Sequence, residues 1–290
     1  MKQITNAERA QLLTQAVPYI KDYTNTYVVV KYGGNAMTDI GLQQSVMEDL
    51  LLLQLVGVKV VLVHGGGPAI NETLSALQIE SQFVNGLRVT DEATMDVVQM
   101  VLAGKVNKDL VALIGALGGK AVGLCGIDGN MIQVHQKDPN LGWVGEVDSI
   151  DTTLIKAVIN EGYIPVIATV GVDVHGNHYN VNADTVAAQV AGALEAETML
   201  TLTNVDGVMK DPTDPASLIP QLTVAETQTL VETGVINGGM IPKVECCLEA
   251  IAAGAHKVSI INGEVPHAIL IELLTDKGLG TLFIAEEDDV

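Results

Sequence analysis

The sequence predicts an α/β protein in which a mainly parallel, open central sheet is covered by helices on both faces. Short apolar, β-branched runs alternate with segments of helical periodicity along most of the 290 residues, and this alternation is typical of parallel sheets. Two of the runs end directly in glycines, at Gly33-Gly34 and at Gly65-Gly66-Gly67. The composition, 48% hydrophobic but only 3% aromatic, is sufficient for a large core of aliphatic side chains.

The N-terminal segment Asn6–Tyr23 is predicted to form an amphipathic helix. Apolar residues such as Leu12 and Ile20 recur there at helical spacing. Pro18 is expected to bend this helix, because proline removes a backbone donor and crowds the preceding turn.

The remaining elements follow the same two patterns. Short apolar runs predict strands at Tyr27–Lys31, Val58–Val63, Ala121–Cys125, Ile164–Val170, Thr198–Thr203 and Lys257–Ile261. Helical spacing predicts helices at Gln43–Leu55, from about Ala69 onward, and at Asp91–Val106, Thr152–Glu161, Ala183–Leu194, Val224–Glu232 and Pro242–Ala253. Turn residues predict a hairpin turn at Asp128-Gly129-Asn130 and a second turn at His175-Gly176-Asn177.

Charge and composition exclude several classes of function. The formal net charge of −20 argues against nucleic acids and anionic membranes as partners, since both need a basic face. No apolar run is long enough to span a bilayer, and the N-terminus lacks the apolar core of a signal peptide. The three cysteines show neither disulfide nor metal-ligand spacing. We therefore expect a soluble, cytoplasmic protein.

The glycines that follow the first two strands are candidate anion-binding turns. Ligands of open α/β sheets bind at the carboxyl ends of the strands, and glycine lets backbone N–H groups approach an anion closely. Tight turns without a ligand are the alternative. The dinucleotide fingerprint is absent, and the P-loop pattern fails because Ala121 follows Gly119-Lys120. The oxyanion loop of lipases would require a nucleophilic serine elbow, which the sequence lacks.

Scarce cations lie close to these glycines and to a third glycine pair. Lys31 ends the first strand, and Lys243 follows Gly238-Gly239 in the first turn of a helix, where its charge opposes the helix dipole. Arg88 is one of only two arginines and could bind a carboxylate through its planar fork. A solvated lysine and a surface ion pair are the alternatives for these cations. Asp184 could orient lysines around phosphates, or it could simply begin a helix.

These residues fall within motifs whose order resembles that of the amino acid kinase family. The motifs are Lys31–Ala36, Val63–Pro68, Asn85–Thr90, Asn180–Asp184, Thr203–Gly207 and Gly238–Lys243. They span nearly the whole chain. The resemblance implies a three-layer αβα sandwich with an oligomerisation and regulatory helix over residues 1–24 and a kinase domain over residues 25–290. Within that domain it implies an acyl-acceptor lobe over 25–185 and a nucleotide lobe over 186–290.

The resemblance also implies roles for individual residues. Lys31 and Lys243 would stabilise the phosphoryl group in transfer, and Asp184 would hold these lysines in place. The acid would be bound by Gly66, Gly67, Arg88 and Asn180. The nucleotide would be bound by Gly33, Gly34, Asn204, Val205, Asp206, Gly207, Val208, Met209, Val235, Ile236 and Asn237. Position 204 is Asn where many relatives have an acidic residue, which is a departure from the family pattern.

The implied reaction is phosphorylation of the γ-carboxylate of N-acetyl-L-glutamate by ATP, an early step of arginine biosynthesis, with Mg²⁺ carried by the ATP. The N-terminal helix and the C-terminal run resemble the arginine-inhibited members of the family, in which the helix joins dimers into a hexamer. His256, Glu272 and Gly278 would then lie near the bound arginine. A helix packed on its own subunit is the alternative.

Competing functions remain open at this point. A sister kinase could act on another carboxylate, on carbamate or on a nucleoside monophosphate. A relative without catalytic activity could sense arginine, although the presence of Lys31, Asp184 and Lys243 argues against that. An oxidoreductase linked to NAD is disfavoured by the missing glycine fingerprint.

Overall fold

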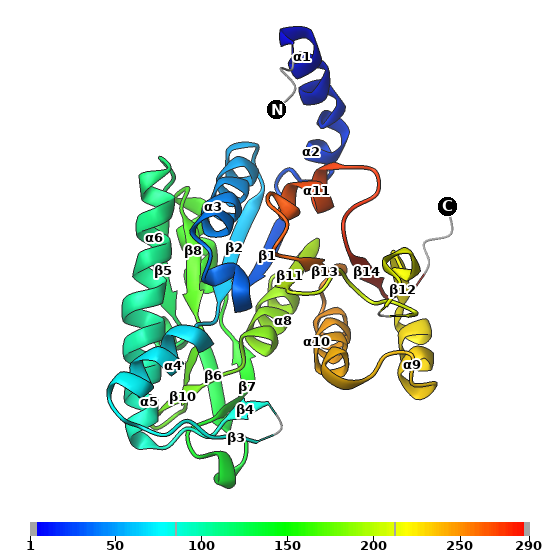
Figure 1. Ribbon diagram of the computed structural model, residues 1–290. Helices are drawn as coiled ribbons and strands as arrows, with labels where there is room; N and C mark the ends of the chain where they lie inside the picture. Colours follow the sequence, from blue (N-terminus) through cyan, green and yellow to red (C-terminus); the bar gives the residue numbers. More distant parts are fainter. Residues whose placement is uncertain (1–4, 85, 212, 287–290) are drawn as a thin grey trace.

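In the computed structural model, which describes residues 5–84, 86–211 and 213–286, an eight-stranded sheet lies between two layers of helices (Figure 1). In spatial order its strands are β12 (Gln221–Thr223), β14 (Thr281–Ile284), β13 (Lys257–Asn262), β11 (Thr198–Thr203), β1 (Tyr27–Tyr32), β2 (Lys59–His64), β8 (Ile164–Ala168) and β5 (Ala121–Cys125). Neighbouring strands are parallel except β13 and β14. The predicted open, mainly parallel sheet is therefore confirmed.

Helices cover both faces of this sheet. One face carries α3 (Ile40–Leu55), α4 (Gly67–Ala76), α5 (Glu92–Gln99), α6 (Asn107–Ala116) and α11 (Ala268–Leu274). The other carries α7 (Thr153–Asn160), α8 (Ala183–Ala193), α9 (Val224–Glu232) and α10 (Ile241–Ala252). Alternate residues of β1 enter the two cores: Val28 and Val30 pack on the first face and Val29 on the second. Burial on both faces explains why the central strands are continuous apolar runs.

A second sheet of four strands lies at one end of the molecule. Its order is β10 (His178–Asn180), β9 (Val170–Val172), β6 (Ile132–Gln136) and β7 (Gly145–Ile150), and a separate hairpin pairs β3 (Phe83–Val84) with β4 (Leu87–Arg88). The predicted hairpin at Asp128–Asn130 is wrong, because that turn joins β5 to β6, which belong to different sheets. The predicted strand Ile164–Val170 likewise divides between the two sheets at Thr169. The turn at His175–Asn177 does join β9 to β10.

Short 3-10 turns connect several of these elements. They are η1 (Gly34–Met37), η3 (Asp128–Asn130), η4 (Pro139–Leu141), η5 (Pro215–Ser217) and η6 (Gly238–Met240). The segment labelled η2 (Met100–Val106) is instead π-helical, and it joins α5 to α6 without a break. The predicted helix thus continues past Val106, because Leu110 and Ile114 restore the apolar spacing and are buried.

The N-terminal segment forms two short helices that project from the sheet, α1 (Asn6–Gln15) and α2 (Val17–Tyr23) (Figure 1). Pro18 lies in the first turn of α2, where the predicted bend occurs. Leu13 is 73% exposed and Val17 56% exposed. The apolar residues Leu12, Leu13 and Val17 are therefore left uncovered by the described chain, whereas Tyr23 at the end of α2 packs against the core. Of the part of the protein described here, no helix combines the length and the apolar character that a membrane crossing requires.

Candidate active site

A buried ion pair lies at the carboxyl end of β1. The Nζ of Lys31 is 3.0 Å from Oδ1 of Asp184, and only 8% of Lys31 is exposed. Asp184 lies in the first turn of α8, where Asn182 caps the helix by accepting the Asp184 N–H at 2.8 Å. A Cβ at Gly33 would lie 3.4 Å from the Lys31 Nζ. The predicted contact between Asp184 and Lys31 is thus present, and Gly33 lies directly beside it.

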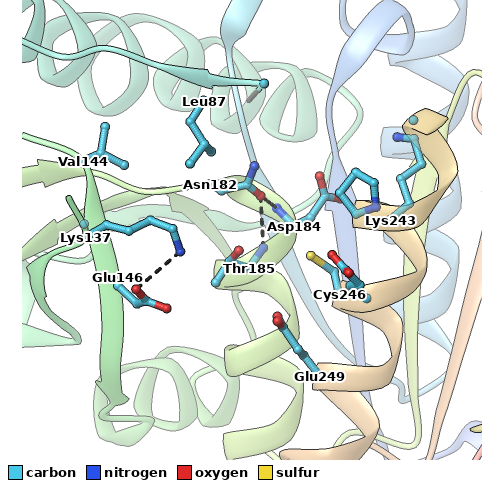
Figure 2. Close-up of a pocket in the computed structure, with 15 residues that line it drawn as sticks. Leu87, Lys137, Val144, Glu146, Asn182, Asp184, Thr185, Lys243, Cys246 and Glu249 are labelled. Carbon is cyan, nitrogen blue, oxygen red and sulfur yellow. Dashed lines mark hydrogen bonds and ion pairs between the residues drawn. The ribbon is translucent and has the colours of Figure 1, made fainter. Parts of the chain in front are cut away.

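Asp184 also lines a cavity of about 390 Å³ to which Lys243 contributes (Figure 2). Lys243 lies in the first turn of α10, as the sequence predicts. The cavity lies between α10 and the strands of the second sheet, from which Lys137 and Glu146 face it as an ion pair of 3.4 Å. Asp184 therefore pairs with Lys31 and shares this cavity with Lys243, the second lysine that the sequence singled out.

The predicted acid-binding residues come together in a second, smaller cavity, with one exception. Gly67, Arg88 and Asn180 line a space of about 180 Å³ together with Gly65. Gly66 lines a different cavity, on the helix side of the same turn. Three segments distant in sequence, at the ends of β2, β4 and β10, thus meet at one place.

Arg88 is a buried cation held by neutral groups. It donates to Oδ1 of Asn71 at 2.7 Å and to the Ser81 hydroxyl, and its guanidinium lies 4.7 Å from the centre of the Phe83 ring. Burial lowers its pKa. Across residues 5–84, 86–211 and 213–286 no carboxylate forms an ion pair with it, so the alternative of a surface ion pair is wrong. An unneutralised, buried guanidinium suits an anionic ligand.

A third cavity, of about 310 Å³, collects most of the predicted nucleotide-binding residues. Those on its lining are Asn204, Val205, Asp206, Gly207, Val208, Met209, Val235, Ile236 and Asn237. Gly33 and Gly34 are not among them and lie beside Lys31 instead. Asn262, which we did not predict, also lines this cavity, and its Nδ2 donates to Oδ1 of Asp206 at 2.7 Å. The position of Asn262 at the end of a strand was the sequence signal that could have identified it as a ligand-binding residue.

Two of the predicted regulatory residues are in direct contact. Oε2 of Glu272 accepts the N–H groups of Leu279 at 2.6 Å and of Gly280 at 3.2 Å. Gly278 has φ 59°, and a Cβ there would lie 2.7 Å from the same oxygen. The Glu272 carboxylate is therefore enclosed by a loop that requires glycine.

The third predicted regulatory residue, His256, lies in a neighbouring cluster. Its Nδ1 is 3.1 Å from Oε2 of Glu197. Tyr23 is the last residue of α2; burial is the main cause that raises its pKa, and the charges of Glu197 and Glu272 raise it further. Tyr19 of the same helix donates to Asp276. Helix α2 thus lies against α11 and the loop after it, through contacts that the sequence did not reveal.

Comparison with known proteins decides the family. Residues 26–262 match the model of the amino acid kinase family. This chain belongs to that family. Curated relatives of the amino acid kinase include acetylglutamate kinase of Syntrophomonas wolfei, 51% identical over 98% of this chain and 99% of the relative. Acetylglutamate kinase of Thermosynechococcus vestitus is 50% identical over 97% and 96%.

Solved structures show the same fold. The N-acetylglutamate synthase of Neisseria gonorrhoeae, solved with coenzyme A and N-acetylglutamate, superposes with a TM-score of 0.82 at 26% identity. The match covers 96% of this amino acid kinase but only 64% of the synthase chain. The smu.665 protein of Streptococcus mutans UA159 has a TM-score of 0.74 at 32% identity, over 90% of this chain and 99% of its own. The expected fold and phosphotransferase family are confirmed.

Proposed function

We propose that this amino acid kinase transfers the γ-phosphoryl group of ATP to the side-chain carboxylate of N-acetyl-L-glutamate, giving N-acetyl-L-glutamyl 5-phosphate and ADP. Curated relatives about half identical over nearly their full length bear the name acetylglutamate kinase, which supports the choice of acid. The observation that carries the proposal is the buried Arg88, which lacks a carboxylate partner in the described part of the chain and shares a cavity with Gly67 and Asn180.

The chemistry requires cations more than it requires a base. The acid is ionised at neutral pH, so the obstacle is its repulsion from the ATP phosphates. Two unit charges about 4 Å apart repel by roughly 4 kcal/mol at an effective dielectric of 20. Lys31 and Lys243 would offset this repulsion and stabilise charge on the phosphoryl oxygens, while Asp184 keeps Lys31 in place.

A divalent metal is the general requirement of kinases that use ATP, and we propose Mg²⁺. In the described ranges no group of three or more His, Cys, Asp or Glu side chains could hold a metal ion. In our proposal the ion enters on the nucleotide phosphates and would supply positive charge there. The nucleotide itself would lie in the cavity lined by residues 204–209 and 235–237.

The test is a hydroxamate trap for acyl phosphate with purified protein, ATP, Mg²⁺ and a panel of acids. We expect product with N-acetylglutamate and little with glutamate, aspartate or carbamate. Product with another acid alone would replace the substrate assignment, and no product with any acid would favour a sensor without catalytic activity.

We further propose feedback inhibition by L-arginine at the Glu272 and Gly278 loop, with the N-terminal helix joining dimers into a hexamer in the cytoplasm. The exposed Leu13 and Val17 and the contacts of Tyr19 and Tyr23 support a role for this helix in assembly and regulation. In this proposal residues 25–185 form the acid lobe and residues 186–290 the nucleotide lobe.

Titration with arginine tests the proposed inhibition, and sedimentation tests the proposed hexamer. We expect arginine to inhibit the full chain, and deletion of residues 1–22 to reduce the hexamer to dimers. Activity that is insensitive to arginine would reject the regulatory site and leave the catalytic proposal unchanged.

A further inference from the structure

His64 lies beneath the glycine turn that follows β2 and is fully buried. Its Nδ1 is 2.8 Å from the carbonyl oxygen of Gly65, and its Nε2 is 3.1 Å from Nδ2 of Asn107. No role in binding or transfer has so far been given to either side chain. A buried polar pair of this kind is costly unless each of its groups finds a partner.

The orientation of the Asn107 amide follows from its other contacts. Its Nδ2 donates to the carbonyl oxygen of Val166 at 2.8 Å, and its Oδ1 accepts from Nζ of Lys108 at 3.0 Å. The reversed amide would set an oxygen against a carbonyl and a nitrogen against an ammonium group. The amide N–H₂ of Asn107 therefore faces the His64 ring.

This arrangement fixes the protonation of His64. Since Asn107 donates to Nε2, that nitrogen has no proton, and Nδ1 must carry the proton that it donates to Gly65. Burial, with a further contribution from Lys108, lowers the pKa of His64 to about 4. The ring is therefore neutral at physiological pH and has one tautomer.

The bond to Gly65 determines how the next amide points. Because a trans peptide is planar, the Gly65 carbonyl and the Gly66 N–H point in opposite directions. Holding the carbonyl thus orients the N–H. The π-helical segment supports the same turn from the side, since a Cβ at Gly66 would lie 2.6 Å from Cδ2 of Leu102. Single-turn π segments are often found at functional sites.

We propose that His64 and Asn107 are positioning residues that set the glycine turn after β2 for binding the carboxylate of the acid substrate. The inference rests on the proposed function, in which the acid lies in the cavity that Gly65 and Gly67 of this turn line together with Arg88. The network reaches the turn from the end of the π-helical segment and joins the ends of β2 and β8. It touches neither the nucleotide cavity nor the ion pair of Lys31.

Gly123 offers a way to disturb this network without changing the turn. A Cβ at Gly123 on β5 would overlap Oδ1 of Asn107, so Gly123→Ala should displace that amide from His64. Gly115→Ala on α6 is the matched control, because a Cβ there meets nothing within 4 Å. Both variants should be checked for folding by their thermal unfolding temperature, and kinetics should then be measured for both substrates.

We expect Gly123→Ala to raise KM for the acid by about tenfold or more, the size of one lost hydrogen bond to a charged group. KM for ATP should stay within about twofold, and Gly115→Ala should match the wild type. A purely structural role would lower the yield of active enzyme, hence the apparent kcat, and would leave the KM for the acid unchanged. Equal changes in both KM values, or none, would overturn the proposal.

Two substitutions of His64 distinguish its hydrogen bond to Gly65 from its hydrogen bond to Asn107. The amide in His64→Asn can replace the Nδ1 donor to Gly65, whereas the amide in His64→Gln reaches only toward Asn107. We expect His64→Asn to retain more affinity for the acid, and the opposite ranking would reject the role of the Gly65 bond. The comparisons use the acid that the wild type converts, so failure with N-acetylglutamate alone would count against the proposed substrate and leave this inference testable.

Discussion

The two turns at the ends of β1 and β2 are both rich in glycine but have different surroundings. The turn at Gly33-Gly34 lies beside the charged pair of Lys31 and Asp184, and Gly34 has φ 69° with open space where a Cβ would be. The turn after β2 is supported by neutral groups, with His64 bonded to Gly65 and Leu102 beside Gly66, and it shares a cavity with Arg88. One turn provides charge and room, and the other provides fixed amides.

This difference shows how neighbouring parallel strands can divide one reaction. Charge at the first turn can act on a phosphoryl group whose position and charge change during transfer. Closely packed amides at the second can hold a carboxylate that should stay still. The comparison predicts that substitutions at the first turn reduce kcat and that substitutions around the second raise KM for the acid.

The largest effect should come from removing either lysine beside Asp184, Lys31 at the first turn or Lys243 on α10. We expect Lys31→Ala and Lys243→Ala each to lower kcat by about 100-fold, the usual cost of one group that stabilises transition-state charge. Lys105→Ala is the control, because this lysine is 63% exposed and forms an ion pair with Asp109 one helical turn away. Steady-state kinetics on folded protein provide the measurement, and near-normal turnover in either active-site variant would remove that lysine from the mechanism.

The pH dependence of the free energy of unfolding should report the burial of the His64 ring beside the second turn. Burial lowers the pKa of His64 to about 4, so unfolding exposes a ring that takes up a proton between pH 6.5 and 4. His64 therefore favours the folded state at neutral pH, and this contribution is lost as the pH falls through that window. The change is on the order of 3 kcal/mol.

Asp49 on α3 should have the opposite effect in nearly the same window. Burial raises its pKa to about 6, against the opposing effect of the 2.7 Å contact with His267. Its stabilising contribution is present at low pH and lost as the pH rises from about 4 to 6. The two contributions nearly cancel in the wild type.

Urea unfolding from pH 4 to 7 should separate these two contributions. We expect the stability of His64→Gln to fall more steeply as the pH rises, and the stability of Asp49→Asn to rise more steeply. Equal slopes in both variants and the wild type would mean that neither group titrates differently on folding.

The smallest effect concerns the backbone of the two turns. Gly34→Ala places a side chain at positive φ and should cost about 1 kcal/mol of stability. Gly67→Ala lies in the first turn of α4 with nothing within 4 Å of the new Cβ, and should be neutral or slightly stabilising. Denaturant midpoints at constant m-value provide the comparison, and a reversed order would show that Gly34 is not held in this conformation.

The sequence predicted the central strands and their flanking helices because burial on both faces makes these runs continuously apolar. It did not reveal β6, β7 or the π-helical segment. The strands of the small sheet are short and half exposed, and a π turn differs from an α turn only in hydrogen bonding. The division of one predicted strand at Thr169 depends on where the two sheets separate, which no local pattern records.

For the site, the sequence indicated the charged and glycine residues but not the groups that hold them. Lys31 and Asp184 lie in recognisable motifs. The buried Arg88 instead donates to Asn71 and Ser81, which belong to no motif that the sequence shows. Asn107 is 43 residues from His64 in sequence, and only the assembled sheet brings them together. Contacts between distant segments are the part that local patterns miss.

The pairing of β1 with β11 has a consequence for motion during turnover. These strands run in register from Val28 beside Thr198 to Lys31 beside Thr201, and β11 leads directly into the loop that begins at Asn204. The Lys31 ammonium group and the loop after β11 are therefore carried by two hydrogen-bonded strands. The distance between them should not change while substrates bind and products leave. Any opening and closing of the site must therefore come from parts of the chain outside these two strands.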